Sequence, residues 1–331
     1  MRTRLIAVAA ALASFAAACS SGGSPDSSGR VRIVTTVSPI TNIVAWVGGE
    51  RVSVTGIVPE GTNSHTFEPR PSDARLVAEA DVIFVNGLGL EEPTLELAEP
   101  NRKEGTEIVK LADRTIDRSE WIFDFSFPES GGDPNPHLWT NPPYAKRFAQ
   151  IVRDTLTTLD PEGVALYDRN YLSFAERIDE LDTAVRAATL SVPEKNRKLL
   201  TYHDSFPYFA REYGWTIVGA VQPSDFSEPT PREVSRLIQQ IRDEGVPAIF
   251  GSEVFPSPVL EQIARESGAT YVAELRDDDL PGSKGDPAHS YFGLMVFDFK
   301  TFMKALGGDV TVFDTIDTAN PDDESNVTYR E

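Results

Sequence analysis

Residues 161–190 read PEGVALYDRNYLSFAERIDELDTAVRAATL, and the expected architecture follows from them. Its apolar side chains recur at helical spacing over about 30 residues, which is unusually long for one helix of a globular protein. They are Val164, Leu166, Tyr167, Tyr171, Leu172, Phe174, Ala175, Ile178, Leu181 and Val185. Pro193 cannot continue a helix. The stretch therefore predicts one long helix over residues 160–192, with separate structure on either side.

The chain before this helix alternates between strand-like and helix-like segments. Residues 31–37 form a run rich in β-branched side chains, and Ser38-Pro39 then supply an N-cap and a first helical position. Further strands are expected at residues 51–58, 81–85 and 107–111. Residues 31–159 are therefore predicted to form an N-terminal α/β lobe.

A second series of strands and helices follows the long helix. Strands are expected at residues 198–202, 215–221, 247–251 and 270–275. Between them, Thr230-Pro231 with Glu233 has the pattern of a capping box at a helix start. Residues 193–306 are thus predicted to form a C-terminal α/β lobe. The acidic tail, residues 307–331, is expected to be loosely held.

Together these segments predict an α/β protein of two lobes with mainly parallel sheets, joined by a single long rigid helix. Ligands of open α/β sheets bind beyond the carboxyl ends of the strands. The cleft between the two lobes is therefore the expected site.

The N-terminus has the pattern of a targeting segment. Basic residues open it, and an apolar stretch too short to span a bilayer follows. The stretch ends in Ala16-Ala17-Ala18-Cys19, small residues before the one cysteine of the chain. This pattern is typical of a bacterial lipoprotein signal, with a plain secretory signal cut near Cys19 as the alternative.

Residues 1–19 are accordingly predicted to be a lipoprotein signal peptide that ends at the lipidated Cys19. Residues 20–30 are rich in Ser and Gly and are predicted to be a flexible tether. We therefore expect an extracytoplasmic protein anchored to the cell membrane by the lipid on Cys19. A single cysteine excludes an internal disulfide.

The charge of the chain excludes one class of partner. Its 331 residues include 31 Lys and Arg against 51 Asp and Glu, a net charge of −20. Nucleic-acid binding needs a basic face, so no nucleic-acid partner is expected. The negative charge is compatible with attraction of cations, and equally with a surface that is only kept soluble.

The histidines supply the candidate site. The chain holds four, and His65, His137 and His203 each lie on a loop after a predicted strand. Asp278 has a similar position later in the chain. Three imidazoles and one carboxylate are a complete inner shell for a tetrahedral metal ion. A closed shell suits binding better than catalysis, because a catalytic zinc keeps one position for water.

Each histidine alone also has an ordinary structural interpretation. His65 could be an exposed loop residue, His137 a packed one, and His203 a helix-entry residue bonded to Asp204. Their shared position at strand ends is what favours a site. The fourth histidine, His289, precedes a helix start and is interpreted as a surface residue or as a support for the ligands.

The choice of carboxylate is open on spacing alone, because Asp277, Asp278 and Asp279 are adjacent. Outer imidazole nitrogens of metal ligands usually donate to carboxylates or carbonyls. Glu68 and Glu253 are candidates for this supporting role, with solvated or helix-capping acids as the alternative.

Four motifs carry a resemblance to a known family. They are Ser64-His65-Thr66-Phe67-Glu68-Pro69, Asn135-Pro136-His137-Leu138-Trp139, His203-Asp204-Ser205-Phe206, and residues 275–280 with Tyr291 downstream. In these motifs the chain resembles the zinc- and manganese-binding solute-binding lipoproteins of bacterial metal ABC importers, the zinc-uptake type of cluster 9. The resemblance runs from about residue 31 to residue 306.

The resemblance implies two α/β lobes bridged by a long rigid helix and a monomer without enzymatic activity. It implies delivery of a captured ion to an ABC importer permease and selects Asp278 as the carboxylate ligand. The ion is expected to be zinc, because manganese-preferring relatives tend to place Glu where this chain has His203, and nitrogen ligands favour zinc. Manganese is the alternative within the family.

Two departures from the family pattern matter. Asn135 stands where Asp is usual, so it can orient a neighbour but brings no charge. Many zinc-uptake members carry a histidine-rich loop before the second motif, whereas residues 112–136 here are acidic and have no histidine. The role of this segment is left open.

Functions of two other classes have less support in the sequence. A zinc hydrolase would use a similar shell with a bound water, but no HExxH or nucleophile-elbow motif occurs. A surface adhesin is a role proposed for some relatives, and no residue pattern here supports it.

Overall fold

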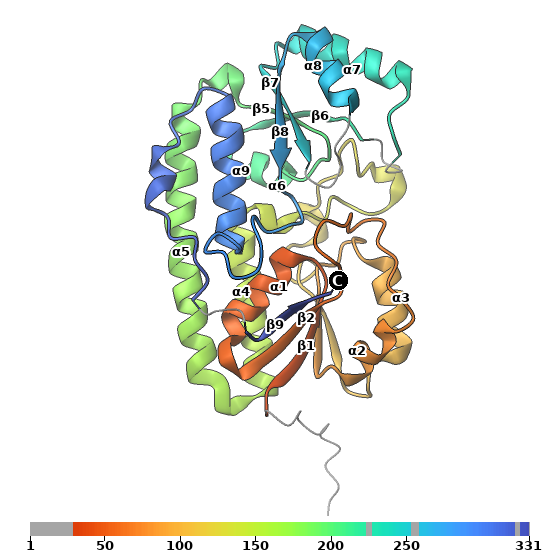
Figure 1. The fold of residues 1–331 in the computed structure, drawn as a ribbon, viewed down its shortest axis with the longest axis vertical. Helices are drawn as coiled ribbons and strands as arrows, with labels where there is room; N and C mark the ends of the chain where they lie inside the picture. The colour runs from red at the N-terminus through yellow and green to blue at the C-terminus, as the bar shows by residue number, and fades with distance from the viewer. Residues whose placement is uncertain (1–28, 223–226, 253–257, 322–324, 331) are drawn as a thin grey trace, which may run out of the picture.

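The computed structural model describes residues 29–222, 227–252, 258–321 and 325–330. The predicted signal peptide with Cys19 and the candidate Glu253 lie outside these residues. The described chain forms two lobes, one above the other in Figure 1, and α5 runs beside both. Within the described residues, no helix combines the length and the apolar character needed to cross a bilayer.

The N-terminal lobe is built on a five-stranded sheet whose neighbouring strands are all parallel. Its spatial order is β4-β3-β1-β2-β9, with β1 Val31–Thr35, β2 Val52–Gly56, β3 Val82–Val85, β4 Glu107–Lys110 and β9 Val327–Tyr329. Its helices are α1 Ser38–Gly48, α2 Asp73–Glu79, α3 Glu92–Asn101 and α4 Pro142–Leu159. All four side chains of β3 are buried, as is typical of a parallel strand covered on both faces.

The C-terminal lobe has a second all-parallel sheet, of order β6-β5-β7-β8. Its strands are β5 Lys198–Thr201, β6 Thr216–Ala220, β7 Ala248–Ser252 and β8 Thr270–Leu275, and its helices are α6 Pro207–Tyr213, α7 Pro231–Glu244 and α8 Pro258–Ser267. The predicted capping box at the start of α7 is confirmed, because Thr230 and Glu233 exchange both of its hydrogen bonds.

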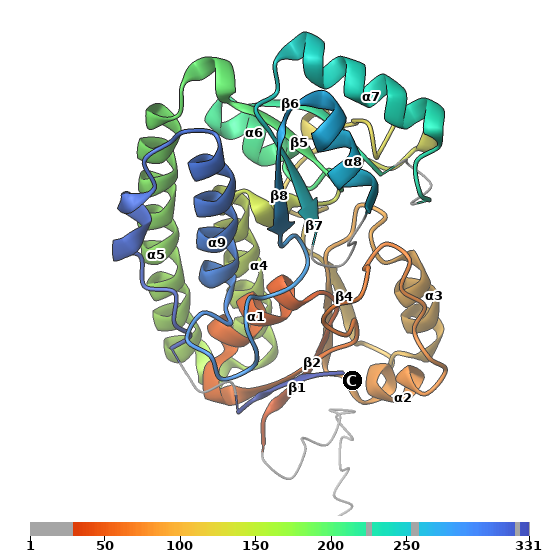
Figure 2. The same cartoon turned by 45° about the horizontal axis from the view of Figure 1, so that its top comes forward.

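One long helix, α5, spans Val164–Ser191 and connects the two lobes (Figure 2). Its buried stripe includes Phe174, whose ring centroid lies 5.5 Å from that of Trp46 on α1. The same ring lies 5.0 Å from Phe292 on α9, which spans Tyr291–Ala305. The predicted fold class, two α/β lobes of parallel sheet joined by a long helix, is confirmed.

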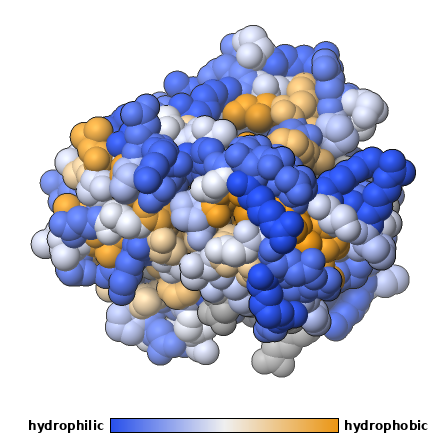
Figure 3. All heavy atoms as spheres, turned by 90° about the horizontal axis from the view of Figure 1, so that it is seen from above, coloured by the Kyte–Doolittle hydropathy of each residue, from blue (hydrophilic) through white to orange (hydrophobic). Residues whose placement is uncertain are grey.

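Short 3-10 turns occur where the chain changes direction. They lie at Gly49–Arg51, Arg118–Glu120, Glu129–Gly131, Leu138–Thr140, Pro161–Gly163, Glu194–Asn196 and Thr311–Thr315. The face seen from above is mostly hydrophilic, and hydrophobic side chains gather only in separate areas (Figure 3). This agrees with a chain of high net charge.

The expectation of a loosely held tail is wrong for its described residues. Strand β9 pairs with β2, where Val327 lies opposite Val54, and the backbone N–H of Val54 donates to the carbonyl of Asn326 at 2.8 Å. Arg330 forms an ion pair with the buried Asp73. The physical reason is that β2 would otherwise be an edge strand with unpaired backbone groups, which a returning segment can satisfy.

We expect Asn326→Ala to lower the free energy of unfolding by about 1–3 kcal/mol, because it leaves a buried carbonyl without its donor. The Asn326 side-chain amide donates to the carbonyl of Gly49 at 2.7 Å within the core. Urea denaturation would measure the effect. Thr328→Ala is the matched control, since Thr328 is an exposed residue two positions further along, within β9. Equal effects of the two substitutions would contradict this account of the tail.

Candidate metal centre

The three candidate histidines come from three different parts of the fold. His65 lies in the loop between β2 and α2, and His137 immediately precedes the 3-10 turn Leu138–Thr140 that leads into α4. His203 follows β5 in the other lobe. His137 and His203 are 0% and 3% exposed, whereas His65 is only partly buried. Both lobes therefore contribute histidines to the same site.

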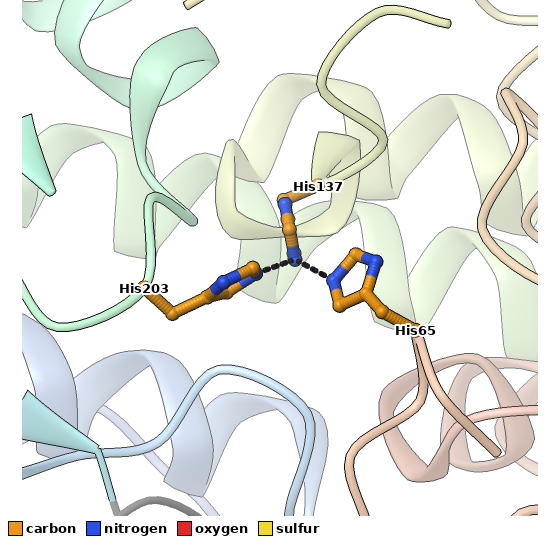
Figure 4. A group of neighbouring side chains, drawn as sticks. All are labelled: His65, His137 and His203. Carbon is orange, nitrogen blue, oxygen red and sulfur yellow. Dashed lines mark hydrogen bonds between the residues drawn. The ribbon is translucent and has the colours of Figure 1, made fainter. Parts of the chain in front are cut away.

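The imidazole rings turn their Nε2 atoms toward a common point (Figure 4). The Nε2 atom of His137 lies 3.1 Å from Nε2 of His65 and 3.0 Å from Nε2 of His203. Among the described residues, these three form the group whose possible metal-ligating atoms all lie within 4.8 Å of one another. The structure thus brings together all three histidines named from the sequence.

The ring of His137 is oriented by Asn135. The side-chain oxygen of Asn135 accepts from the His137 ring at Nδ1, 2.9 Å away, and from the His137 backbone N–H at 3.0 Å. The Asn135 amide nitrogen is directed elsewhere, to the Asp124 carboxylate at 2.8 Å and the Asp204 carbonyl at 2.6 Å. Because an amide oxygen can only accept, Nδ1 of His137 carries the proton and Nε2 keeps its lone pair.

His203 is held in the same way from the other lobe. Its Nδ1 lies 3.1 Å from the side-chain oxygen of Gln222, which follows β6. This partner likewise leaves Nε2 of His203 as an acceptor. Two amide oxygens thus hold these rings in the way that carboxylates or backbone carbonyls hold histidines that bind a metal.

This arrangement fits a divalent cation. Two Nε2 atoms that both keep lone pairs have no proton to share, yet those of His137 and His203 approach to 3.0 Å. A cation between them converts this contact into two bonds. Ligand nitrogens at about 2.0–2.1 Å from a tetrahedral zinc lie about 3.3 Å apart, close to the spacing found here.

The environment keeps the imidazoles neutral. Burial lowers the pKa of His65 and of His137 well below the ordinary value, and the neighbouring imidazole of His203 lowers both further. Burial also lowers the pKa of His203, while the charge of Asp277 and the bond to Gln222 act in the opposite direction. Neutral imidazole is the form that binds metal.

The three adjacent aspartates have different partners. Asp277 accepts from the Ser205 hydroxyl at 2.7 Å and from the Ser252 hydroxyl at 3.3 Å. Asp279 accepts from the backbone N–H of Gly61. One oxygen of Asp278 accepts from the Ser64 hydroxyl.

The other oxygen of Asp278, Oδ1, is buried without a hydrogen-bond partner among the described residues. A buried acceptor without a donor is costly, and a cation would satisfy it. Asp278 lies outside the group of three histidines. Its role as a ligand stays a prediction.

The remaining candidates are not members of this group. Glu68 is exposed and outside the group. His289 was expected at the surface or beside the ligands, but it is fully buried, with Nε2 3.4 Å from the carboxylate of Glu60. The loop that precedes its helix is covered by the returning tail, which includes Tyr329, and this explains the burial.

Sequence reasoning missed two residues of the site. Gln222 orients His203. The one feature of the sequence that could have indicated this role is the position of Gln222 directly after a predicted strand. The ring of Phe127 lies 5.4 Å from His65, 5.8 Å from His137 and 6.1 Å from His203, centroid to centroid. Nothing in the composition of residues 112–136 distinguishes Phe127 from the other aromatic residues there.

Comparison with known proteins gives a family match over most of the chain. Residues 33–305 match the family model described as "Zinc-uptake complex component A periplasmic". The match includes all three histidines and Asp278.

Individual relatives differ in the metal named for them. The manganese-binding lipoprotein MntA of Halalkalibacterium halodurans is 30% identical over 302 residues, covering 91% of this chain and 97% of the relative. The iron-binding protein YfeA of Yersinia pestis is 28% identical over 291 residues, covering 88% and 91%. The structure of the periplasmic zinc-binding protein TroA from Treponema pallidum superimposes with a TM-score of 0.76 at 26% identity, covering 84% of this chain and 100% of that one.

Proposed function

Since this chain belongs to the family of periplasmic components A of zinc-uptake complexes, we propose that it captures zinc outside the cytoplasm for an ABC importer. Its relatives are metal-binding proteins of such importers for manganese, zinc or iron. As a member of this family it binds a divalent metal ion and works with a permease. The choice of zinc and of its ligands is our proposal.

The observation that carries the proposal is the convergence of three imidazole Nε2 atoms, two of them held as acceptors by Asn135 and Gln222. We assign His65, His137 and His203 as ligands, with Asp278 as the fourth. Four protein ligands leave no position for a reactive water, so the proposed role is transport and not catalysis.

Zinc is favoured over manganese by the donor set. Three nitrogens and one oxygen suit zinc, whereas manganese is better matched by oxygen-rich sites. Manganese is the second candidate, because the relative MntA is named for that metal. Affinity order alone places zinc ahead at almost any site of this kind, so the two ions must be compared directly.

The proposed attachment to the membrane rests on sequence. Cys19 would carry the lipid, and residues 20–30 would form the tether between the membrane and the first lobe. We further propose that the protein acts as a monomer, because both lobes of one chain complete the site.

Metal analysis tests the proposal. Protein purified without added metal should carry one zinc ion per chain in native mass spectrometry. Competition titration at controlled free concentrations of both ions should then show tighter binding of zinc than of manganese. Preferential binding of manganese would transfer the assignment to that ion, and absence of any metal binding would refute the site.

We expect zinc affinity to depend on pH in one direction only. Protons compete for the imidazole lone pairs, so affinity must fall as the solution becomes acidic. Because burial lowers the pKa of all three histidines, affinity should lose little to imidazole protonation between pH 8 and about 6.5, the ordinary histidine pKa. Titrations across this range would measure it. In Asp278→Asn, which has no carboxyl group at the proposed fourth ligand to compete for protons, a steep loss that begins above pH 7 would contradict the assignment of buried neutral histidine ligands.

A further inference from the structure

A small pocket leads from the surface to the candidate metal centre. It has a volume of about 240 Å³, and its wall includes His65, Leu88, Gly89, Phe127, Pro128 and Asp133. Of the three histidines, only His65 lines it. His137 and His203 lie behind, almost completely buried. An ion that enters here meets His65 first.

The ring of Phe127 lies at this pocket and beside the two deeper histidines. It contacts all three imidazoles, with its plane at 65° to the ring of His137 and 81° to that of His203. Phe127 also lines the pocket. An ion bound by His65 alone therefore has this ring beside its path to the other two nitrogens.

The backbone around Phe127 is closed into a tight turn by Asp124. One oxygen of the Asp124 carboxylate accepts from the backbone N–H of Ser126 at 3.0 Å and from that of Phe127 at 2.9 Å. The Asp124 backbone N–H in turn donates to the Phe127 carbonyl at 2.9 Å. The other carboxylate oxygen accepts from Asn135, the residue that orients His137. The turn is thereby tied to the metal centre, and the Phe127 side chain is left as the part that can rotate.

We propose that Phe127 is the gate of the metal site: its side chain must swing away from the imidazoles for an ion to pass from His65 to His137 and His203. This proposal rests on the proposed function, because it needs a metal centre at the histidines. Asp133, the charged residue of the pocket wall, attracts the cation to the entrance. His65 is the first ligand bound and the last released.

A gate acts on rates and leaves the equilibrium largely unchanged. The closed ring has to give up its contacts with the imidazoles whether the ion enters or leaves. Removing the ring should therefore speed association and dissociation together. Aromatic pairs of this kind contribute enough that loss of three should change each rate by about tenfold or more.

Zinc kinetics test the gate in the full chain. Association is followed by competition with a zinc-responsive dye, and dissociation by adding excess chelator to the loaded protein. Phe127→Ala should accelerate both by about tenfold or more, with little change in their ratio. Phe127→Leu, which keeps apolar bulk, should give a smaller acceleration in the same direction and carries the test if the alanine variant does not fold.

Phe125→Ala is the matched control. Phe125 lies two residues away in the same segment and is 58% exposed, so most of its ring is in solvent. Its rates should equal those of the unaltered protein. Equal acceleration by both substitutions, acceleration of dissociation alone, or no acceleration by Phe127→Ala would each overturn the gate.

A measurement without metal separates this proposal from the proposed function. Diethyl pyrocarbonate modifies accessible histidines, and peptide mass spectrometry reports the rate at each of them. In the metal-free protein, Phe127→Ala should speed modification of His137 and His203, the two histidines behind the gate, while Phe125→Ala should not. Unchanged modification of these two histidines would overturn the gate even if zinc binds, and failure of zinc to bind at equilibrium would refute the site while leaving this result intact.

Discussion

Replacing His137 with alanine should reduce zinc affinity by roughly a thousandfold. A zinc site of four protein ligands contributes about 10–16 kcal/mol, so one ligand accounts for about 3–4 kcal/mol, or roughly 10²–10³ in affinity. We place His137 at the upper end of this range because it is the central member of the proposed ligand set: its Nε2 atom is the one within 3.1 Å of both other imidazoles. Without it, His65 and His203 face each other across a space that water fills.

Calorimetry or competition with a chelator of known affinity would measure the loss. His289→Gln is the control, because it removes the remaining histidine of the chain, which is equally buried but lies beside Glu60. It should leave zinc affinity unchanged, whatever it does to stability. A thermal unfolding curve of metal-free His137→Ala would establish that the variant is folded. If both substitutions lowered affinity equally, the site would not be at the three histidines.

The fold was predictable because its main signals are local. The apolar stripe of residues 161–190 follows from the sequence alone, and α5 is observed at Val164–Ser191. The alternation of strands and helices on either side predicts parallel sheets without knowledge of any contact. The three histidines were predictable as site residues for a related reason. Each lies on a loop after a predicted strand, and ligands of such sheets bind beyond the carboxyl ends of the strands.

The parts that were not predictable depend on contacts between distant residues. The pairing of β9 with β2 joins residues more than 270 positions apart, and an acidic composition says nothing of backbone pairing. The same holds for the bond between Gln222 and His203 and for the ring of Phe127 over the imidazoles. Among three adjacent aspartates, spacing could not select a ligand because their partners come from different segments.

Replacing Asp277 and Asp278 one at a time with asparagine should show which of them binds zinc. We expect the larger loss of zinc affinity at Asp278. We expect Asp278→Asn to lower zinc affinity by about 10²–10³-fold, the contribution of one ligand, because a neutral amide replaces the one charged group of the proposed ligand set. Asp277→Asn should cost about tenfold. Both Asp277 oxygens accept hydroxyl hydrogen bonds, so it acts as a support for its neighbours.

Asp278→Asn should lower zinc affinity without lowering the folding stability of the metal-free protein. Burial and the neighbouring Asp277 raise the pKa of Asp278 well above its ordinary value, so the folded protein binds this proton more tightly than the unfolded chain. The stability that this carboxyl group contributes is therefore present in acid and is lost as the pH rises. At neutral pH, Asp278→Asn removes that cost, and the metal-free variant should melt no lower than the unaltered protein. A greater loss of zinc affinity in Asp277→Asn would assign the ligand to Asp277. A metal-free Asp278→Asn that melts well below the unaltered protein would show instead that Asp278 stabilises the fold. A residue whose role is to bind the ion is expected to lower the stability of the metal-free protein.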